Sequence, residues 1–356
     1  MAFTENNTLR ELVDETTLIK EDVTNNRDTL KANLRNKGIE TTEVSKLPDL
    51  INKVNDIEVE KHDIPDWLTF HNRYFEANNY IKRRYAANGT VGKFIYVLGG
   101  HGGTTGVLSR VDCYNTNENT WTTKTKMPEA RTQVGSATIN ENIYVLGGTN
   151  SSNDYMSSNY CYNTKTDTWT SKTETPITKP IYVNAVNNNI YLIDASIETG
   201  TKTNWQYNTI TDTWTQKSSM PLVRGGANSE AVDENIYIMG GKYGSGSSNY
   251  YSNYCYNTLT DTWTQKRDTP VWMGQSLNVV SEKYIYVIGG YYYNSGNYYQ
   301  SYNYCYNSLA DTWENKAPLQ KARADSSGGI VGSHIYVIGG SENTTALLDD
   351  TLVYLI

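Results

Sequence analysis

The hydrophobic pattern of this chain is a short apolar run that returns at nearly constant intervals. Each run begins with Ile-Tyr, continues with apolar residues and in most copies ends in Gly-Gly. The runs start at Ile95, Ile143, Ile190, Ile236, Ile285 and Ile335, with steps of 48, 47, 46, 49 and 50 residues. Short runs rich in β-branched and aromatic residues predict buried strands, and a fixed period of this size predicts a repeat architecture.

A second series has the same period. A tryptophan stands six or seven residues after a Tyr-Asn pair, at Trp121, Trp169, Trp214, Trp263 and Trp313. Within the second unit, alternation and turn residues predict four strands, over 136–140, 142–147, 159–164 and 168–172. We call these positions strands a, b, c and d of a unit.

The apolar strand ending in Gly-Gly, the tyrosine and the spaced tryptophan together resemble the kelch repeat, over about residues 66–356. The resemblance implies an all-β, six-bladed propeller with one four-stranded blade per unit. In the third unit Asp194-Ala195 replaces Gly-Gly, so we expect a distorted end of strand b there. The last unit stops at Ile356 without its tryptophan strand, and Trp67 lies 54 residues before Trp121. We therefore expect residues 65–71 to supply strand d of the sixth blade and close the ring.

Residues 1–62 have a different hydrophobic periodicity from the predicted propeller at 63–356. Apolar positions over 9–34 and 47–57 follow a helical stripe, and Gly38 is suited to end the first helix. Such narrow apolar faces form no core alone, so this short α-helical segment is expected to dock or to self-associate. The stretch 19–54 resembles helical segments in tail and baseplate appendage proteins of phages that infect Gram-positive bacteria. The resemblance implies attachment to other tail or baseplate proteins; the alternative is a helical cap packed on its own propeller.

The connections between strands differ on the two faces of the predicted ring. The a–b and c–d turns are short and nearly uniform, whereas the b–c loops are long and different in every unit. Variable loops on a rigid scaffold are where recognition is normally placed. Their tyrosines stand among Ser, Gly and Asn, a composition common in recognition surfaces and suited to sugars. We predict a ligand-binding face formed by Tyr243, Tyr250, Tyr251, Tyr291, Tyr292, Tyr293, Tyr298, Tyr299, Trp272 and His101.

Some of these tyrosines have an alternative role in packing between blades. Strand alternation requires at least one residue of the run Tyr291–Tyr292–Tyr293 to point inward.

A cationic position recurs twelve residues before the apolar runs. It is occupied by Arg83, Arg131, Arg224 and Arg323, by Met273 in the fifth unit and, after a one-residue gap, by Lys179 in the third. The kelch resemblance places such arginines near the mouth of the central channel. Five cations there would attract an anionic glycan. Alternatively, each arginine is held by a neighbouring backbone carbonyl or acid.

The remaining chemistry favours binding over catalysis. The cysteines Cys113, Cys161, Cys255 and Cys305 occupy equivalent points of different units, too far apart to bridge, so we expect them buried and reduced. The four histidines are scattered, and no zinc spacing or nucleophile turn is present, so we expect no metal, no cofactor and no enzyme activity. An acidic-sugar epimerase or mutarotase would need little more than arginines and an acid or base such as Glu129 or His101.

Composition and charge limit the classes of partner that we expect. A net charge of -7 argues against a nucleic-acid partner, and no run approaches 18 apolar residues, so no membrane partner is expected. The N-terminal stretch has no apolar core of a secretory signal, which predicts synthesis in the cytoplasm.

Three functional hypotheses follow from these patterns. The preferred one is an appendage of a phage tail or phage-tail-like particle, whose b–c loop face binds a host cell-surface glycan or protein. Self-association through residues 1–62 would make this appendage a homo-oligomer. The alternatives are a bacterial sugar-processing enzyme and an intracellular kelch interaction adaptor.

Overall fold

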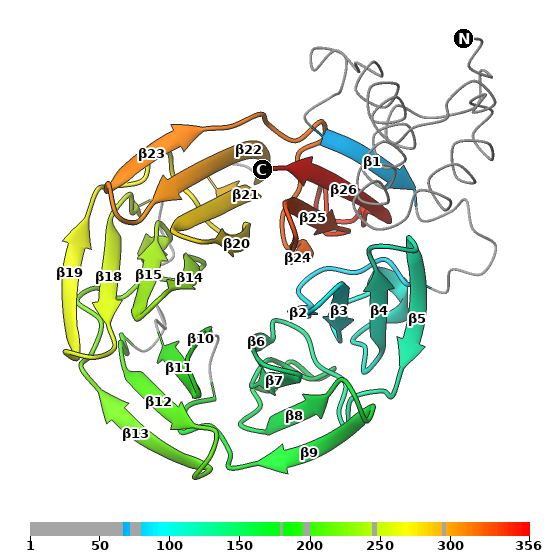
Figure 1. Cartoon of the computed structure of the whole chain (residues 1–356), viewed down its shortest axis with the longest axis horizontal. Coiled ribbons are helices and arrows are strands. Elements are labelled where there is room, and N and C mark those ends of the chain that lie inside the picture. The colour runs from blue at the N-terminus through cyan, green and yellow to red at the C-terminus, as the bar shows by residue number, and fades with distance from the viewer. Residues whose placement is uncertain (1–66, 72–79, 179–180, 195–199, 244–247, 294–296) are drawn as a thin grey trace, which may run out of the picture. The chain divides into compact units, whose positions relative to one another are not determined.

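The computed structural model describes residues 67–71, 80–178, 181–194, 200–243, 248–293 and 297–356. These residues form six four-stranded sheets around a central axis, and one additional two-stranded ribbon (Figure 1). Each sheet is one blade, so the predicted all-β six-bladed propeller is confirmed. The predicted helical segment at 1–62 lies outside the described residues. Within them, the one helical element is the 3-10 turn η1 (Gly103–Thr105).

The first three blades follow the chain without interruption. Blade 1 contains β2 (Ala87–Val91), β3 (Phe94–Leu98), β4 (Val111–Asn115) and β5 (Thr120–Lys124). Blade 2 contains β6 (Gly135–Ile139), β7 (Asn142–Leu146), β8 (Asn159–Asn163) and β9 (Thr168–Lys172). Blade 3 contains β10 (Ile181–Val186), β11 (Asn189–Asp194), β12 (Asn204–Asn208) and β13 (Thr213–Lys217).

Blades 4 and 5 follow in the same order. Blade 4 contains β14 (Asn228–Val232), β15 (Asn235–Met239), β18 (Asn253–Asn257) and β19 (Thr262–Lys266), with the ribbon β16 (Lys242–Tyr243) and β17 (Ser248–Asn249) between its middle strands. Blade 5 contains β20 (Leu277–Ser281), β21 (Tyr284–Tyr293), β22 (Asn297–Asn307) and β23 (Thr312–Asn315).

The sixth blade draws on both ends of the chain. It contains β24 (Ser327–Val331), β25 (His334–Ile338) and β26 (Asp350–Leu355), and the sheet order places β1 (Trp67–His71) beside β26. The locking of the ring by this strand stays a prediction, for which the Discussion gives a test. In blade 3, β11 pairs regularly up to Asp194, and the residues directly after it lie outside the described part.

The uniform hairpin turns follow from residues that tolerate positive φ. Every a–b turn contains one such residue, in order Gly92, Asn140, Asn187, Asp233, Glu282 and Gly332, with φ between 51° and 57°. The c–d turns contain Asn119, Asp167, Asp212, Asp261 and Asp311, with φ between 52° and 58°. Glycine, asparagine and aspartate visit this region at the lowest cost, which explains why these short turns repeat from blade to blade.

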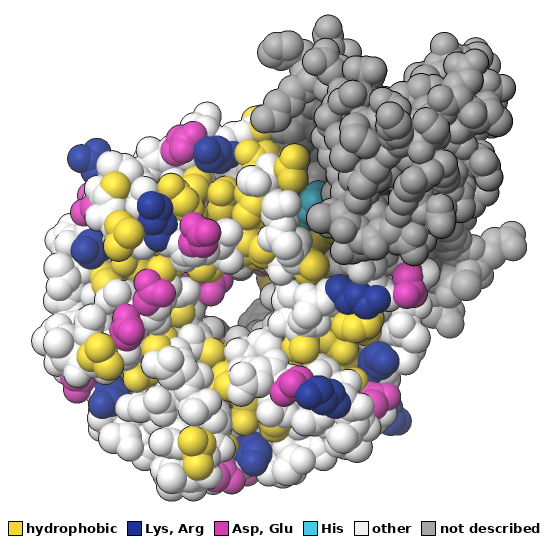
Figure 2. Space-filling model, in the orientation of Figure 1, with side chains coloured by type: hydrophobic (Ala, Val, Ile, Leu, Met, Phe, Trp, Pro, Cys, Tyr) yellow, Lys and Arg dark blue, Asp and Glu magenta, His cyan; other side chains and the backbone are white. Residues whose placement is uncertain are grey.

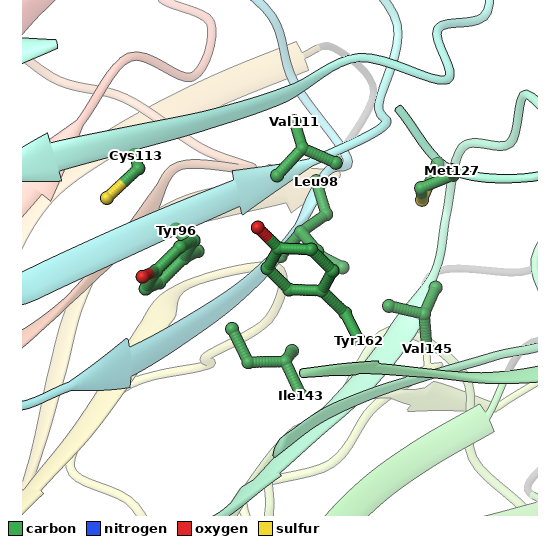
Figure 3. Close-up of a cluster of buried hydrophobic side chains, with 9 residues drawn as sticks. Tyr96, Leu98, Val111, Cys113, Met127, Ile143, Val145 and Tyr162 are labelled. Atoms are coloured by element: carbon green, nitrogen blue, oxygen red, sulfur yellow. The ribbon is translucent and has the colours of Figure 1, made fainter. Parts of the chain in front are cut away.

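The core lies between neighbouring blades. Strand b is buried on both faces, and the tyrosine of strand c packs against the preceding blade. Tyr162 of blade 2 packs edge-on against Tyr96 of blade 1, with ring centroids 5.9 Å apart, beside Met127 (Figure 3). The same tyrosine is covered by Trp169 at 4.9 Å. Aromatic pairs of this kind recur around the ring and add buried apolar surface to the interfaces between blades.

The cysteines belong to this core. All four are free and buried, as predicted. Burial raises the pKa of the Cys113 thiol to about 11, so it stays protonated at neutral pH. Figure 3 shows this thiol beside Tyr96.

Polar contacts fasten one blade to the next. In blade 4 the Asp261 carboxylate accepts a hydrogen bond from the Tyr256 hydroxyl at 2.6 Å and from the Ser218 backbone N–H of blade 3 at 2.8 Å. The Trp263 indole N–H donates to the Ser218 carbonyl at 2.9 Å. Equivalent sets join blades 1 and 2, 2 and 3, and 4 and 5, through Asp167, Asp212 and Asp311. We call each set an aspartate clasp.

The Gly-Gly pair is required by close packing at the inner end of strand b. Gly99 has φ 66°, and a Cβ there would lie 2.6 Å from the carbonyl oxygen of Arg131 in the next blade's entry segment. A larger residue would push the blades apart.

Candidate ligand-binding site

The b–c connections are the variable part of the structure, as predicted, and blade 5 has the most elaborate one. It is a β-ribbon in which β21 and β22 continue past the sheet, with a register shift between Ile288 and Gly290. Beyond the shift, Tyr291 pairs with Tyr299 and Tyr292 pairs with Tyr298. The ribbon therefore holds its tyrosines in fixed positions on a hydrogen-bonded frame.

Strand alternation separates these tyrosines onto the two faces of the ribbon. The Tyr291 and Tyr299 rings meet edge-on at 5.4 Å on one face. On the other face Tyr292 lies 6.2 Å from Tyr298 and 5.3 Å from Trp272. The expectation that one residue of the run points inward is met by Tyr292.

A pocket of about 540 Å³ lies on the Tyr292 face of the ribbon, where blades 4 and 5 meet. We call it the blade-5 pocket. It is lined by Tyr251, Pro270, Val271, Trp272, Tyr292, Gln300, Ser301, Tyr302, Tyr304, Asn315 and Pro318. Three of the predicted site residues, Tyr251, Tyr292 and Trp272, thus share one cavity. Aromatic rings form its walls, and the polar groups are amides and hydroxyls.

Tyr251 and Trp272 contribute in different ways. The Tyr251 side chain comes from the blade 4 connection and is 47% exposed, so its ring is accessible to a ligand. Trp272 is only 7% exposed, and its indole N–H donates to the Gly241 carbonyl at 2.8 Å. A Cβ on Gly274 would lie 2.9 Å from the Trp272 ring, so glycine is needed to seat it. Trp272 is therefore a support beneath Tyr292 more than a contact surface.

The recurring arginines do not form a cationic rim. Arg83, Arg131, Arg224 and Arg323 are each at most 1% exposed. This finding corrects the anion-binding interpretation and agrees with its alternative, in which carbonyls and acids hold each arginine. Figure 2 likewise shows no dark-blue ring around the opening at the centre of the described residues on the face in view. Lys179 lies outside the described residues.

Each arginine ties strand b to strand c within its own blade. In blade 4 the Arg224 guanidinium donates to the carbonyls of Gly240 at 3.0 Å and Ser252 at 2.8 Å, and to the Ser252 hydroxyl at 2.8 Å. Burial lowers the pKa of Arg224. In blade 2 Arg131 makes the equivalent bonds to Gly147 and Ser158. We call this arrangement the arginine clamp.

An acid completes the clamp in other blades. Asp112 pairs with Arg83 in blade 1, and the Asp350 carboxylate takes two bonds from Arg323 in blade 6, at 2.7 and 2.8 Å. Glu129, the candidate catalytic acid or base of the sequence analysis, pairs with Arg131 at 2.7 Å and so belongs to a clamp.

Blade 5 lacks the clamp, and both of its members have changed together. Met273, fully buried, takes the arginine position, and Tyr302 takes the position of Ser158 and Ser252, three residues before the cysteine. The Tyr302 hydroxyl shares a hydrogen bond with Ser276 Oγ at 3.0 Å, and burial raises its pKa. The exchange removes a cation and adds an aromatic wall at the position where the pocket has formed.

The other predicted residues lie elsewhere. His101 belongs to the blade 1 connection, where its backbone pairs with Arg84 and its Nδ1 accepts the Gly103 N–H at 3.1 Å. The Tyr250 ring lies 5.3 Å from the Arg224 guanidinium. Tyr243 and Tyr293 stand at the ends of β16 and β21. Neither His101 nor Tyr250 lines the blade-5 pocket.

The sequence interpretation missed Gln300, Tyr302 and Tyr304. They line the pocket from β22, with Gln300 on the far side of the register shift from Tyr304. The signal was present in the run Asn297–Asn307, but only Tyr298 and Tyr299 were selected from it as site residues.

A second group of polar residues surrounds the axis. Backbone N–H groups of Gln133, Tyr85, Asp325 and Gln275 each donate to the preceding blade, at 3.0 to 3.4 Å, and all four residues have positive φ. Burial raises the pKa of the Asp325 carboxyl to about 7, although Arg84 and a hydrogen bond from Tyr85 oppose the shift.

Two features are absent from the described residues. No group of three or more His, Cys, Asp or Glu side chains is placed to hold a metal ion. No described helix is long and apolar enough to cross a membrane.

Comparison with known proteins agrees with this architecture. Residues 85–276, more than half of the chain, match the family described as the KLHDC2/KLHL20/DRC7 Kelch-repeats domain, and residues 276–320 match the Kelch motif. No curated protein matches the chain. Among solved structures, "Structure of YjhT" superposes with a TM-score of 0.68 at 15% identity, covering 79% of this chain and 97% of that chain, a likeness that shows the fold alone. With its repeat, its six four-stranded blades and these matches, the chain belongs to the Kelch-repeats family.

Proposed function

We propose that this protein is a recognition module whose blade-5 pocket binds a glycan on a cell surface. The observation that carries the proposal is the cavity itself, with Tyr251 and Tyr292 as aromatic walls and Gln300 and Asn315 as amide groups. Sugar rings present CH faces that pack on aromatic rings, and their hydroxyls match side-chain amides. The ribbon holds these groups ready, which lowers the entropic cost of binding.

The proposed role requires no bond to be made or broken. The described residues that line the pocket include no acid, no base and no histidine. We therefore place the protein among binding proteins and propose no catalytic residue for this pocket.

The biological setting of the proposal rests on residues 19–54, not on the propeller. Their resemblance to appendage segments of phages of Gram-positive bacteria supports a role in host attachment. In this setting residues 1–62 fasten the protein to a tail or tail-like particle, and the propeller presents its variable face to the host.

A second candidate function, turnover of a sugar, is supported by the axial group. A carboxyl with a pKa of about 7 beside Arg84 has the properties of a general acid or base. Incubation of the full chain with acidic and neutral reducing sugars, followed by NMR of the anomeric signals, tests it. Faster sugar interconversion with the wild-type chain, lost in Asp325→Asn, would support turnover and contradict a purely binding role.

The binding proposal is tested by titrating the fluorescently labelled full chain onto intact Gram-positive cells and isolated wall fractions. We expect saturable binding to some strains and to their wall glycan, with protease treatment of the cells leaving it unchanged. Binding that protease abolishes would show a protein receptor. Absence of binding across a broad strain panel would refute cell-surface recognition.

A further inference from the structure

We propose, resting on the recognition role above, that the ligand of the blade-5 pocket is an uncharged oligosaccharide and not an anionic wall polymer. Two observations made independently of each other lead to this assignment: the charge of the lining and the repeat comparison of blade 5 with the other blades.

Among the described residues, the lining of the blade-5 pocket contains no charged side chain. Arg224 and Arg323 are the clamp arginines that flank the pocket residues in the sequence. They are 0% and 1% exposed, and they already bond to Ser252 and Asp350. A phosphate or carboxylate entering the pocket would lose water without gaining a cation. Such uncompensated transfer of charge is strongly unfavourable.

The repeat comparison shows that the uncharged position sets this blade apart from blades 1, 2, 4 and 6. Four other blades keep an arginine at the position that Met273 occupies. The serine or acid that would pair with it is replaced by Tyr302, whose ring lies 5.7 Å from Tyr304. The same exchange that removes the positive charge therefore builds the aromatic wall of the pocket.

The polar groups that remain suit hydroxyls. The Gln300, Asn315 and Ser301 side chains both donate and accept hydrogen bonds, as each sugar hydroxyl does. A volume of about 540 Å³ lies in the range of pockets that enclose small organic ligands, enough for a short oligosaccharide segment. Tyr251 from blade 4 and Tyr292 from blade 5 supply aromatic surface for the CH faces.

Calorimetric titration of the full chain tests the assignment. The probes are neutral oligosaccharides of glucose, galactose, rhamnose and N-acetylglucosamine, and glycerol-phosphate and ribitol-phosphate polymers, each at 50 and 500 mM NaCl. We expect at least one neutral probe to bind, with Kd changing less than about twofold with salt, because no ion pair is screened. Tyr251→Ala should weaken it about tenfold or more, while Tyr155→Ala, an equally exposed b–c tyrosine of blade 2, should not.

Other results would overturn the assignment. Tight binding of a phosphate polymer that weakens steeply at 500 mM NaCl would show that charge drives recognition. If cells and wall fractions bind the chain but no neutral probe does, the ligand class is wrong while the recognition role stands. If neither cells nor probes bind, the recognition role fails together with this inference. Melting curves of both variants separate loss of binding from loss of fold.

Discussion

Replacing Asp261 by alanine tests how the ring is held together. The Asp261 carboxylate is the centre of an aspartate clasp, bonded to the Tyr256 hydroxyl at 2.6 Å and to the Ser218 N–H of the neighbouring blade at 2.8 Å. Asp261 also has φ 56°, a conformation that aspartate tolerates better than alanine. The substitution therefore removes two hydrogen bonds and introduces backbone strain at one position.

The expected cost follows from these losses. A hydrogen bond to a charged group contributes about 1.5–3 kcal/mol, and leaving the Ser218 N–H without its partner costs about 1–2 kcal/mol. Alanine at positive φ adds about 1 kcal/mol. Because one carboxylate makes both bonds, these effects overlap, and we expect Asp261→Ala to lower the free energy of unfolding by about 3–5 kcal/mol. Asp261→Asn keeps the φ preference and one acceptor, so it should cost only about 1 kcal/mol.

Urea unfolding of the full chain, followed by tryptophan fluorescence, measures both variants beside Tyr256→Phe. Combining Tyr256→Phe with Asp261→Ala should cost less than the two single changes together, because both remove the bond between the Tyr256 hydroxyl and Asp261. The clasp would be refuted as a stabilising feature if Asp261→Ala cost less than about 1 kcal/mol, or if alanine and asparagine were equivalent.

Three further predictions concern other parts of the ring. Arg224→Met should lower the free energy of unfolding by about 3 kcal/mol or more, since Ser252 loses its partner. An unchanged melting temperature of this variant would show that the arginine clamp is dispensable. Burial raises the pKa of Asp325 and of Glu230 to about 7, so their stabilising contribution is complete below about pH 4 and is lost as pH rises through 7. The melting temperature should thus fall between pH 5 and pH 8, and Asp325→Asn with Glu230→Gln should flatten that slope; an unchanged slope would contradict these shifts. Removing residues 1–71 should lower the melting temperature by about 5 °C or more relative to removing 1–62, because β1 lies beside β26 in the sixth sheet, and equal stability would disprove ring closure by this strand.

The fold was predictable because the repeat is local and redundant. The Ile-Tyr runs, the Tyr-Asn pairs and the tryptophans each carry the same period, so an error in one series is corrected by the others. Turn residues such as Asn140 and Asp261 also reveal the hairpins through their tolerance of positive φ. Local preferences and the global architecture agree at nearly every position.

The sequence left two roles for the arginines because their spacing does not reveal where the side chains point. Arg224 stands on a segment entering strand a, and its guanidinium turns back into its own blade to reach Gly240 and Ser252. Whether such a side chain faces the channel or the blade depends on carbonyls that are 14 to 28 residues away in the chain. Only the structure distinguishes an anion-binding role from the alternative, in which carbonyls and acids hold each arginine.

The candidate site was only partly predictable for a similar reason. The tyrosine-rich connection of blade 5 was visible, but its continuation as a ribbon depends on the pairing of Tyr292 with Tyr298. The pocket also needs Tyr251 from another blade and Trp272 from the segment between them. Proximity of this kind arises from the packing of blade 4 against blade 5, which a single repeat unit does not encode.

The most direct test of the central claim is to compare Tyr251→Ala and Tyr155→Ala for binding to the wall fraction that the wild-type chain recognises. Both tyrosines lie on b–c connections, and they are 47% and 40% exposed, so neither change should disturb the core. The blade-5 pocket predicts that Tyr251→Ala weakens binding about tenfold or more and that Tyr155→Ala binds like the wild type. Equal affinity of the two variants, both folded, would contradict the assignment of recognition to this pocket.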